Sequence, residues 1–226
     1  MVRCAVLTSQ IFYFPLEHAE EALGRMAKPI PAALGFRVKS GWAMAVLLCG
    51  SSREPRFVKC REALLSDPQI PQSKQPHHAG LELPAREGAR VTEKLRRVVS
   101  EAAEKSVAEL LKQASDGGYD VRGAGCVVGS LVDPATLHNE HIRAHGLEGQ
   151  LFRSVLEDAL RARKIPCAVF VEKGAYDAAA AALRMTAGQV KRTIAKLGEA
   201  HDGNWRAEEK LAALAAWVAL RNAMRS

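Results

Sequence analysis

The chain has 226 residues, of which 48% are apolar and 25% are charged. This composition is ordinary for a globular protein and excludes collagen, low-complexity sequence and wholesale disorder. The net charge of +7 favours polyanionic partners. The length suits one domain, or one domain with an N-terminal appendage.

No run of about 18 consecutive apolar residues occurs, so we expect no membrane-spanning segment. The apolar run over residues 4–14 is interrupted by polar residues and lacks a small-residue cleavage site, so it is not expected to be a secretory signal. The five cysteines, an odd number, form no C-x-x-C pair. These features predict reduced thiols in a cytoplasmic protein rather than a disulfide framework or a zinc ribbon.

Residues 1–31 are expected to form an N-terminal arm or appendage. A strand-like apolar run leads into a short helix predicted over residues 15–27, and Pro29 and Pro31 then break the chain. The remaining residues, 32–226, are predicted to form the folded domain.

The first part of this domain has the pattern of strands. Residues 33–48 begin with alternating apolar and polar side chains, become continuously apolar, and are predicted to be one strand. Residues 50–55 form a loop, and residues 56–65 form a second strand that completes an antiparallel hairpin. Residues 66–89 are rich in Pro, Gln, His and Gly and are predicted to be a long irregular loop, a kind of segment that often carries function.

The rest of the chain alternates between helices and buried strands. An amphipathic helix is predicted over residues 90–115, ended by Gly117 and Gly118. Asp133 and Pro134 give a helix start, with an N-cap residue followed by proline. The predicted strands are 120–130 and 165–171, and the predicted helices are 133–163, 175–185, 186–197 and 206–224. Because helices separate these strands, we expect them to pair in parallel, which gives an α/β fold.

Three segments carry a family resemblance. Residues 35–43, Gly-Phe-Arg-Val-Lys-Ser-Gly-Trp-Ala, occupy the place of a first-strand pattern G-x-D-x-G-x-x-x-x-G-x-A. The stretch from Ser130 through Asn139 to Gly149 follows a later strand. Residues 205–215, Trp-Arg-Ala-Glu-Glu-Lys-Leu-Ala-Ala-Leu-Ala, take the place of a last-helix pattern D-x-x-D-A-x-A-x-A. Over residues 33–222 this order resembles the ribonuclease H-like superfamily, in the branch of the RuvC-type Holliday-junction resolvases. The resemblance implies a mixed sheet, with an N-terminal antiparallel hairpin and then parallel strands, flanked by helices.

The acidic residues of this pattern are largely missing. Nucleases of the family hold two divalent cations between carboxylates from the first strand, the later strand and the last helix. In this sequence Arg37 and Lys39 stand near the first position, and the later strand offers Ser130 with only Asp133 nearby. The last helix keeps its acids. The resemblance therefore implies a scaffold that has lost two-metal hydrolysis and whose cleft has become basic.

Arg37 and Lys39 lie two residues apart on a strand, so their side chains project from the same face. One interpretation is a phosphate or carboxylate site in which Arg37 is the bidentate donor. The other is an internal ion pair with Glu208 or Glu148. The residues alone leave both open.

A histidine pattern follows in the predicted helix 133–163. His138, His141 and His145 fall at i, i+3 and i+7, and Glu148 follows at i+10, so a helix would gather them on one side. This spacing is compatible with zinc binding. A structural or solvated histidine cluster is the alternative, and Gly146 and Gly149 weaken the helix.

Other polar side chains also have two interpretations. Arg143 and Glu148 flank the buried face of the same helix, either as an ion pair or as an anion-binding or acid–base site. His78 is either solvent-facing or, if its loop folds over the cleft, a phosphate contact. Trp205, with Arg206 nearby, is either a base-stacking platform or a packing contact at a helix start.

These observations favour a domain that binds nucleic acid or a nucleotide phosphate and needs no cofactor. Its expected contacts are Arg37, Lys39, Ser40, Trp42, His78, Arg143, His145, Arg206 and Lys210. The alternative is a nuclease or phosphotransferase dependent on Mg²⁺ or Mn²⁺, with Glu148, Glu208 and Glu209 as catalytic residues and Asp133 and Glu208 as metal ligands. An interaction scaffold without a ligand is a third hypothesis. No phosphate loop of the G-x-x-x-x-G-K type is present.

Overall fold

The computed structural model describes residues 28–223, so the predicted helix over 15–27 lies outside the described residues. Five strands form one sheet in the order β3-β2-β1-β4-β5. β1 pairs antiparallel with β2, and β2 with β3, whereas β1–β4 and β4–β5 are parallel pairs. The expected α/β fold with a mixed sheet is confirmed. The strands are β1 Ile30–Lys39, β2 Trp42–Gly50, β3 Pro55–Leu64, β4 Tyr119–Val128 and β5 Cys167–Val171.

The prediction of one strand over residues 33–48 was wrong. The segment contains most of β1 and β2, which are joined by a tight turn at Ser40 and Gly41. Gly41 has φ of +82°, a conformation that glycine adopts without strain. The hydrophobicity pattern did not predict this turn, because apolar residues continue on both sides of it. The antiparallel part of the sheet is therefore a three-stranded meander, with β3 as its third strand.

The predicted loop over residues 66–89 also contains more structure than expected. It holds a short 3-10 helix, η1 Pro71–Lys74, the helix α2 Pro76–Leu81 and the beginning of α3 Ala85–Asp116. Pro71 and Pro76 are the first residues of η1 and α2, where the missing amide hydrogen costs nothing. The α2 backbone lies close to α3, since a Cβ added to Gly88 would be 2.2 Å from the Gly80 carbonyl oxygen.

The prediction of a single helix over residues 133–163 was likewise wrong. Asp133 caps only the 3-10 turn η2 Pro134–Thr136, in which its side chain accepts a hydrogen bond from the Ala135 amide. The chain is then extended until Asn139, whose side chain accepts from the Ile142 amide at 3.0 Å and begins α4 Glu140–Arg161. A second capping residue, Asn139, thus starts the long helix six residues after the predicted cap at Asp133.

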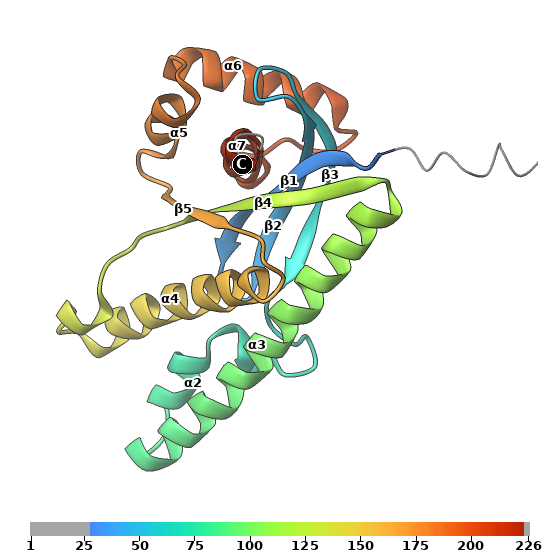
Figure 1. Ribbon diagram of the computed structural model, residues 1–226. Coiled ribbons are helices and arrows are strands. Elements are labelled where there is room, and N and C mark those ends of the chain that lie inside the picture. Colours follow the sequence, from blue (N-terminus) through green and yellow to red (C-terminus); the bar gives the residue numbers. More distant parts are fainter. Residues whose placement is uncertain (1–27, 224–226) are drawn as a thin grey trace, which may run out of the picture.

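Helices cover both faces of the sheet (Figure 1). α2, α3 and α4 lie on one side, where Phe36 of β1 packs in a core with Phe152 and Leu156 of α4. The other side carries α5 Ala175–Leu183, α6 Ala187–Leu197 and α7 Ala207–Ala223, and a short 3-10 turn, η3 Gly198–Ala200, follows α6. Among residues 28–223, every helix is too short or too polar to span a bilayer.

α7 lies directly on the centre of the sheet. A Cβ at Gly35 of β1 would be 1.9 Å from the Ala212 carbonyl oxygen, and one at Gly125 of β4 would be 2.7 Å from that of Ala215. Glycine in the strands and alanine in the helix therefore allow the two backbones to approach closely. This contact fixes the start of α7, with Glu208, beside the carboxyl end of β1.

Candidate functional site

A cleft of about 370 Å³ opens at the carboxyl ends of β1 and β4. Crevices at this edge of parallel strands are the usual ligand sites of open α/β sheets. The cleft is lined by residues 37–40 of β1 and its turn, by residues 128–134 after β4, and by His145, Gly146, Gly149, Gln150, Phe152 and Arg153 of α4. Of the predicted contacts, it brings together Arg37, Lys39, Ser40 and His145, with Asp133 at the same edge.

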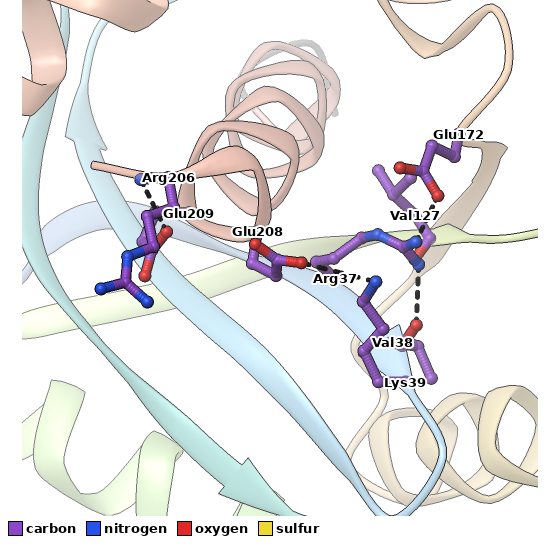
Figure 2. A network of polar contacts seen from close by, with 8 residues as sticks. All are labelled: Arg37, Val38, Lys39, Val127, Glu172, Arg206, Glu208 and Glu209. Atoms are coloured by element: carbon purple, nitrogen blue, oxygen red, sulfur yellow. Dashed lines mark hydrogen bonds and ion pairs between the residues drawn. The ribbon is translucent and has the colours of Figure 1, made fainter. Parts of the chain in front are cut away.

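Arg37 is 3% exposed, and its guanidinium is occupied by internal partners. Nη1 donates hydrogen bonds to the Val38 carbonyl at 2.8 Å and to the Val127 carbonyl at 3.4 Å. Nη2 forms an ion pair with the carboxylate of Glu172, the residue that follows β5. The internal ion pair weighed for Arg37 therefore exists, but its partner is neither Glu208 nor Glu148 (Figure 2).

Lys39 lies farther along the same face and pairs with Glu208 across 3.4 Å. Both side chains are about one-third exposed, so this pair lies at the cleft surface. The pKa of Glu208 is lowered by a hydrogen bond from its own backbone amide at the start of α7, and further by Lys39 and Arg37. Glu208 is therefore a carboxylate at neutral pH with a cation already beside it.

Glu208 and Glu209 point in different directions (Figure 2). Glu209 is 8% exposed, and its Oε2 accepts a hydrogen bond from the Arg206 amide at 2.9 Å. This contact caps α7, as an acidic residue at the third helical position commonly does. Glu209 therefore has a structural role at the helix start and does not join Glu208 beside Lys39.

The aromatic and basic residues expected near α7 do not line the cleft. The Trp205 indole packs edge-on against Phe57 and donates its N–H to the Ile194 carbonyl at 2.9 Å, so it acts as a packing contact. Arg206 is exposed and Lys210 half-buried. Trp42 is half-buried at the start of β2, opposite Lys39 in the strand register.

α2 brings His78 to α4, where it meets His141 and His145. The ring centroids of His78 lie 4.9 Å from His141 and 4.3 Å from His145. His138 was expected in this group, but it precedes α4 in the extended segment and does not belong to it. The sequence thus indicated a histidine cluster with one wrong member, because the third histidine comes from a segment predicted to be an irregular loop.

Glu148 is buried beneath these histidines, with 1% of its surface exposed. Its Oε1 accepts hydrogen bonds from the backbone amides of His77 and His78 and lies 3.3 Å from His78 Nδ1. Burial raises the pKa of Glu148 to about 7, against the opposing effect of the two amide hydrogen bonds. Burial and the neighbouring histidines lower the pKa values of His78 and His145. Glu148 therefore pairs with His78, and Arg143 is not its partner.

Arg143 lies on another side of α4. Its Nε donates to the Leu137 carbonyl at 2.9 Å, which ties the extended segment to the helix. The side chain lines a separate cavity of about 410 Å³ formed with residues of α2 and α3. Arg143 therefore does not contribute to the cleft, contrary to the expectation that it joined Arg37 and Lys39.

Two residues of the site were not predicted from the sequence. The first is Glu172, which follows a parallel strand and therefore reaches the same sheet edge as Arg37. Arg153 reaches the cleft from α4, 24% exposed, with its Nε 3.4 Å from Glu157 Oε2. It stands four and eight residues after Gly149 and His145, a spacing that indicates a shared helix face.

No protein-family model matches the sequence, and no curated protein matches it. Among solved structures, the chain is similar to a Thermus thermophilus RuvC structure, with 10% identity and a TM-score of 0.48 over 83% of this chain and 92% of that one. It is also similar to T. thermophilus RuvC in complex with a Holliday junction substrate, with 11% identity and a TM-score of 0.48 over 86% and 96%. The chain itself has an α/β fold with a mixed five-stranded sheet: a three-stranded antiparallel meander, two parallel strands added to β1, and helices on both faces.

Proposed function

We propose that the cleft binds phosphate groups of a nucleic acid or nucleotide and does not hydrolyse them. The observation that supports this most is the charge at the carboxyl end of β1. Lys39 and Arg153 reach the cleft surface, while the nearby carboxylates Glu172 and Glu208 already carry cationic partners. An incoming phosphate can take the place of Glu208 on Lys39 and of Glu157 on Arg153, and the net charge of +7 favours the approach of a polyanion.

The walls of the cleft suit a polyanion. Ser40 and Ser130 are exposed hydroxyl donors in the cleft lining, one after β1 and one after β4. A Cβ at Gly149 would meet nothing within 4 Å, so the α4 wall is open to a ligand at that point. Hydroxyl donors and cationic side chains surround this open crevice. Such an arrangement suits the positioning of a sugar-phosphate backbone better than the enclosure of a small molecule.

Each cation has a distinct part in this proposal. Arg37 is fixed by Glu172 and the two carbonyls, so it supplies a constant charge beneath the cleft floor and does not contact the ligand. Lys39 exchanges Glu208 for a phosphate oxygen when the ligand binds. Arg153 makes the same exchange with Glu157, and its planar guanidinium offers two parallel donors to one phosphate.

The donor set does not fit the pair of Mg²⁺ or Mn²⁺ ions implied by the family. Those cations require several oxygen ligands around one point. Arg37 stands at the first-strand position, Glu208 is paired with Lys39, and Asp133 is engaged with the Ala135 amide. Among residues 28–223, no three carboxylates gather closely enough to share an ion.

The nuclease or phosphotransferase alternative is correspondingly weaker. Its three proposed acids lie in different environments: Glu148 beneath the histidines, Glu208 beside Lys39, and Glu209 at the cap of α7.

Fluorescence anisotropy with labelled single-stranded DNA, duplex DNA, a four-way DNA junction and duplex RNA tests the proposal. We expect saturable binding that weakens as salt increases, with no cleavage after addition of Mg²⁺ or Mn²⁺. The double variant Lys39→Gln/Arg153→Gln should bind more weakly and lower the salt slope by about 2. Arg192→Gln/Lys196→Gln, a matched loss of one Arg and one Lys on the exposed face of α6, should bind like the wild type.

Two results would contradict the proposal. One is equal binding by Lys39→Gln/Arg153→Gln and by Arg192→Gln/Lys196→Gln, since the cleft would then not be the contact. The other is metal-dependent cleavage that is lost in Glu208→Gln, which would establish the alternative.

A further inference from the structure

Three histidines from two helices converge beside the cleft. One ring nitrogen of each of His78, His141 and His145 lies within 4.8 Å of the others, and no other such group of three His, Cys, Asp or Glu side chains occurs within residues 28–223. The Nε2 atoms of His141 and His145 are 3.1 Å apart. Two tetrahedral ligands with Zn–N bonds of about 2.0–2.1 Å are separated by about 3.3 Å, so this pair already has ligand spacing.

His78 is held by a buried carboxylate on its other nitrogen. Its Nδ1 lies 3.3 Å from Glu148 Oε1, and the same oxygen accepts the backbone amides of His77 and His78. Since Nδ1 is engaged by Glu148, Nε2 is the nitrogen left to act as a ligand. Histidines that bind metals commonly have their second nitrogen on a carboxylate in this way.

Two polar atoms of this arrangement lack hydrogen-bond partners among residues 28–223. His78 Nε2 is buried and has no hydrogen-bond partner there, and the same is true of Glu148 Oε2. Glu148 itself is only 1% exposed. A buried nitrogen without a partner costs free energy, and a metal ion bound to its lone pair would remove that cost.

We propose that His78, His141 and His145 together bind one Zn²⁺ ion, with Glu148 as a positioning residue that orients His78. Imidazole nitrogens suit zinc, whereas Mg²⁺ requires oxygen ligands. The site ties α2 to α4. His141 and His145 are exposed, so their rings have the freedom to close the remaining separation from His78.

Three protein ligands leave the fourth tetrahedral position open for water or an anion. His145 also lines the cleft, so the open position lies at the cleft edge. Occupation of that position by a phosphate oxygen rests on the proposed function, whereas binding of the ion does not.

Metal titration of the full chain, produced without an oligohistidine tag and freed of metal by a chelator, tests the site. We expect calorimetry to show one Zn²⁺ per chain and Co²⁺ to give the visible absorption of a tetrahedral complex. Excess Mg²⁺ should not compete. Zn²⁺ should also raise the unfolding temperature, because it binds only the folded arrangement of α2 and α4.

The double variant His141→Ala/His145→Ala should lose the Co²⁺ spectrum and the one-to-one binding. His138→Ala removes an exposed histidine close in sequence but outside the cluster, and it should keep both. Glu148→Gln should weaken Zn²⁺ binding about 10- to 100-fold, the range seen when such supporting carboxylates are changed. Circular dichroism verifies the fold of each variant, and the two exposed ligands leave no core void when shortened.

The proposal is overturned if the wild-type chain shows no saturable Zn²⁺ binding, or if the double variant and His138→Ala bind Zn²⁺ equally. Either result would make the group a plain imidazole cluster. Zn²⁺ binding without oligonucleotide binding would leave the metal site standing and contradict only the proposed function.

Discussion

Arg37 of β1 and Glu172 after β5 form an ion pair across the carboxyl end of β4, the strand between them. The Val127 carbonyl of β4 accepts from the same guanidinium at 3.4 Å. Arg37 is nearly fully buried, whereas the Glu172 side chain is 46% exposed. One basic side chain thus connects three neighbouring strands at the edge where the cleft opens.

Removal of Glu172 should destabilise the protein because it leaves a buried cation without a carboxylate. We expect Glu172→Ala to lower the free energy of unfolding by about 2–3 kcal/mol, below the usual value for a fully buried pair because Glu172 is half-exposed. Arg37→Met/Glu172→Ala should recover much of that loss, since no unpaired charge remains. Urea unfolding of both single variants and the double variant gives the coupling energy. Strictly additive effects would show that the ion pair contributes nothing.

Gly35→Ala should separate α7 from the sheet. The added methyl group would meet the Ala212 carbonyl oxygen and the Ala216 amide, which are backbone atoms that cannot move aside alone. We expect a loss of about 1–3 kcal/mol or more, measured by urea unfolding. Gly149→Ala is the matched control, because its methyl group enters open space in a helix and should stabilise by about 0.5–1 kcal/mol. Equal effects of the two changes would refute the close contact.

The ion pair between Lys39 and Glu208 should make the free energy of unfolding depend on pH in the acidic range. The folded-state pKa of Glu208 is lowered by its own backbone amide and by Lys39, so its contribution is complete above the unfolded-state pKa and is lost as pH falls through the folded-state value. We expect Glu208→Gln to cost about 0.5–1 kcal/mol at neutral pH. The difference from wild type should shrink as pH falls below the unfolded-state pKa of about 4.3 and vanish once pH is below the folded-state value. A difference that persists unchanged in acid would mean that the Glu208 charge is not responsible.

Gly88→Ala should displace α2, because its methyl group would collide with the Gly80 carbonyl. His78 would move with α2, away from His141 and His145. We therefore expect weaker Zn²⁺ binding although all three proposed ligands remain, and faster amide exchange within α2. Calorimetry and hydrogen exchange measure these effects. Wild-type Zn²⁺ affinity in a folded Gly88→Ala variant would show that the position of α2 is irrelevant to the site.

The sequence by itself determined most of the helices and strands and their order, but not the turn at Gly41, the helix α2 or the start of α4. Periodic apolar side chains marked the long helices, and helix-separated strands required parallel pairing of β4 and β5. The alternation at residues 36–39 placed Arg37 and Lys39 on one face, and the structure keeps them there. These features depend on neighbours along the chain, so local patterns were sufficient to predict them.

Only the tertiary structure decided which side chains meet. Glu172 reaches Arg37 because β5 lies beside β4, and His78 replaces His138 in the histidine cluster because α2 folds against α4. The turn at Gly41 escaped the pattern because apolar strands on both sides of it are buried. Contacts of this kind join residues far apart in the chain, and their free energy comes from packing and burial that exist only once the fold has formed.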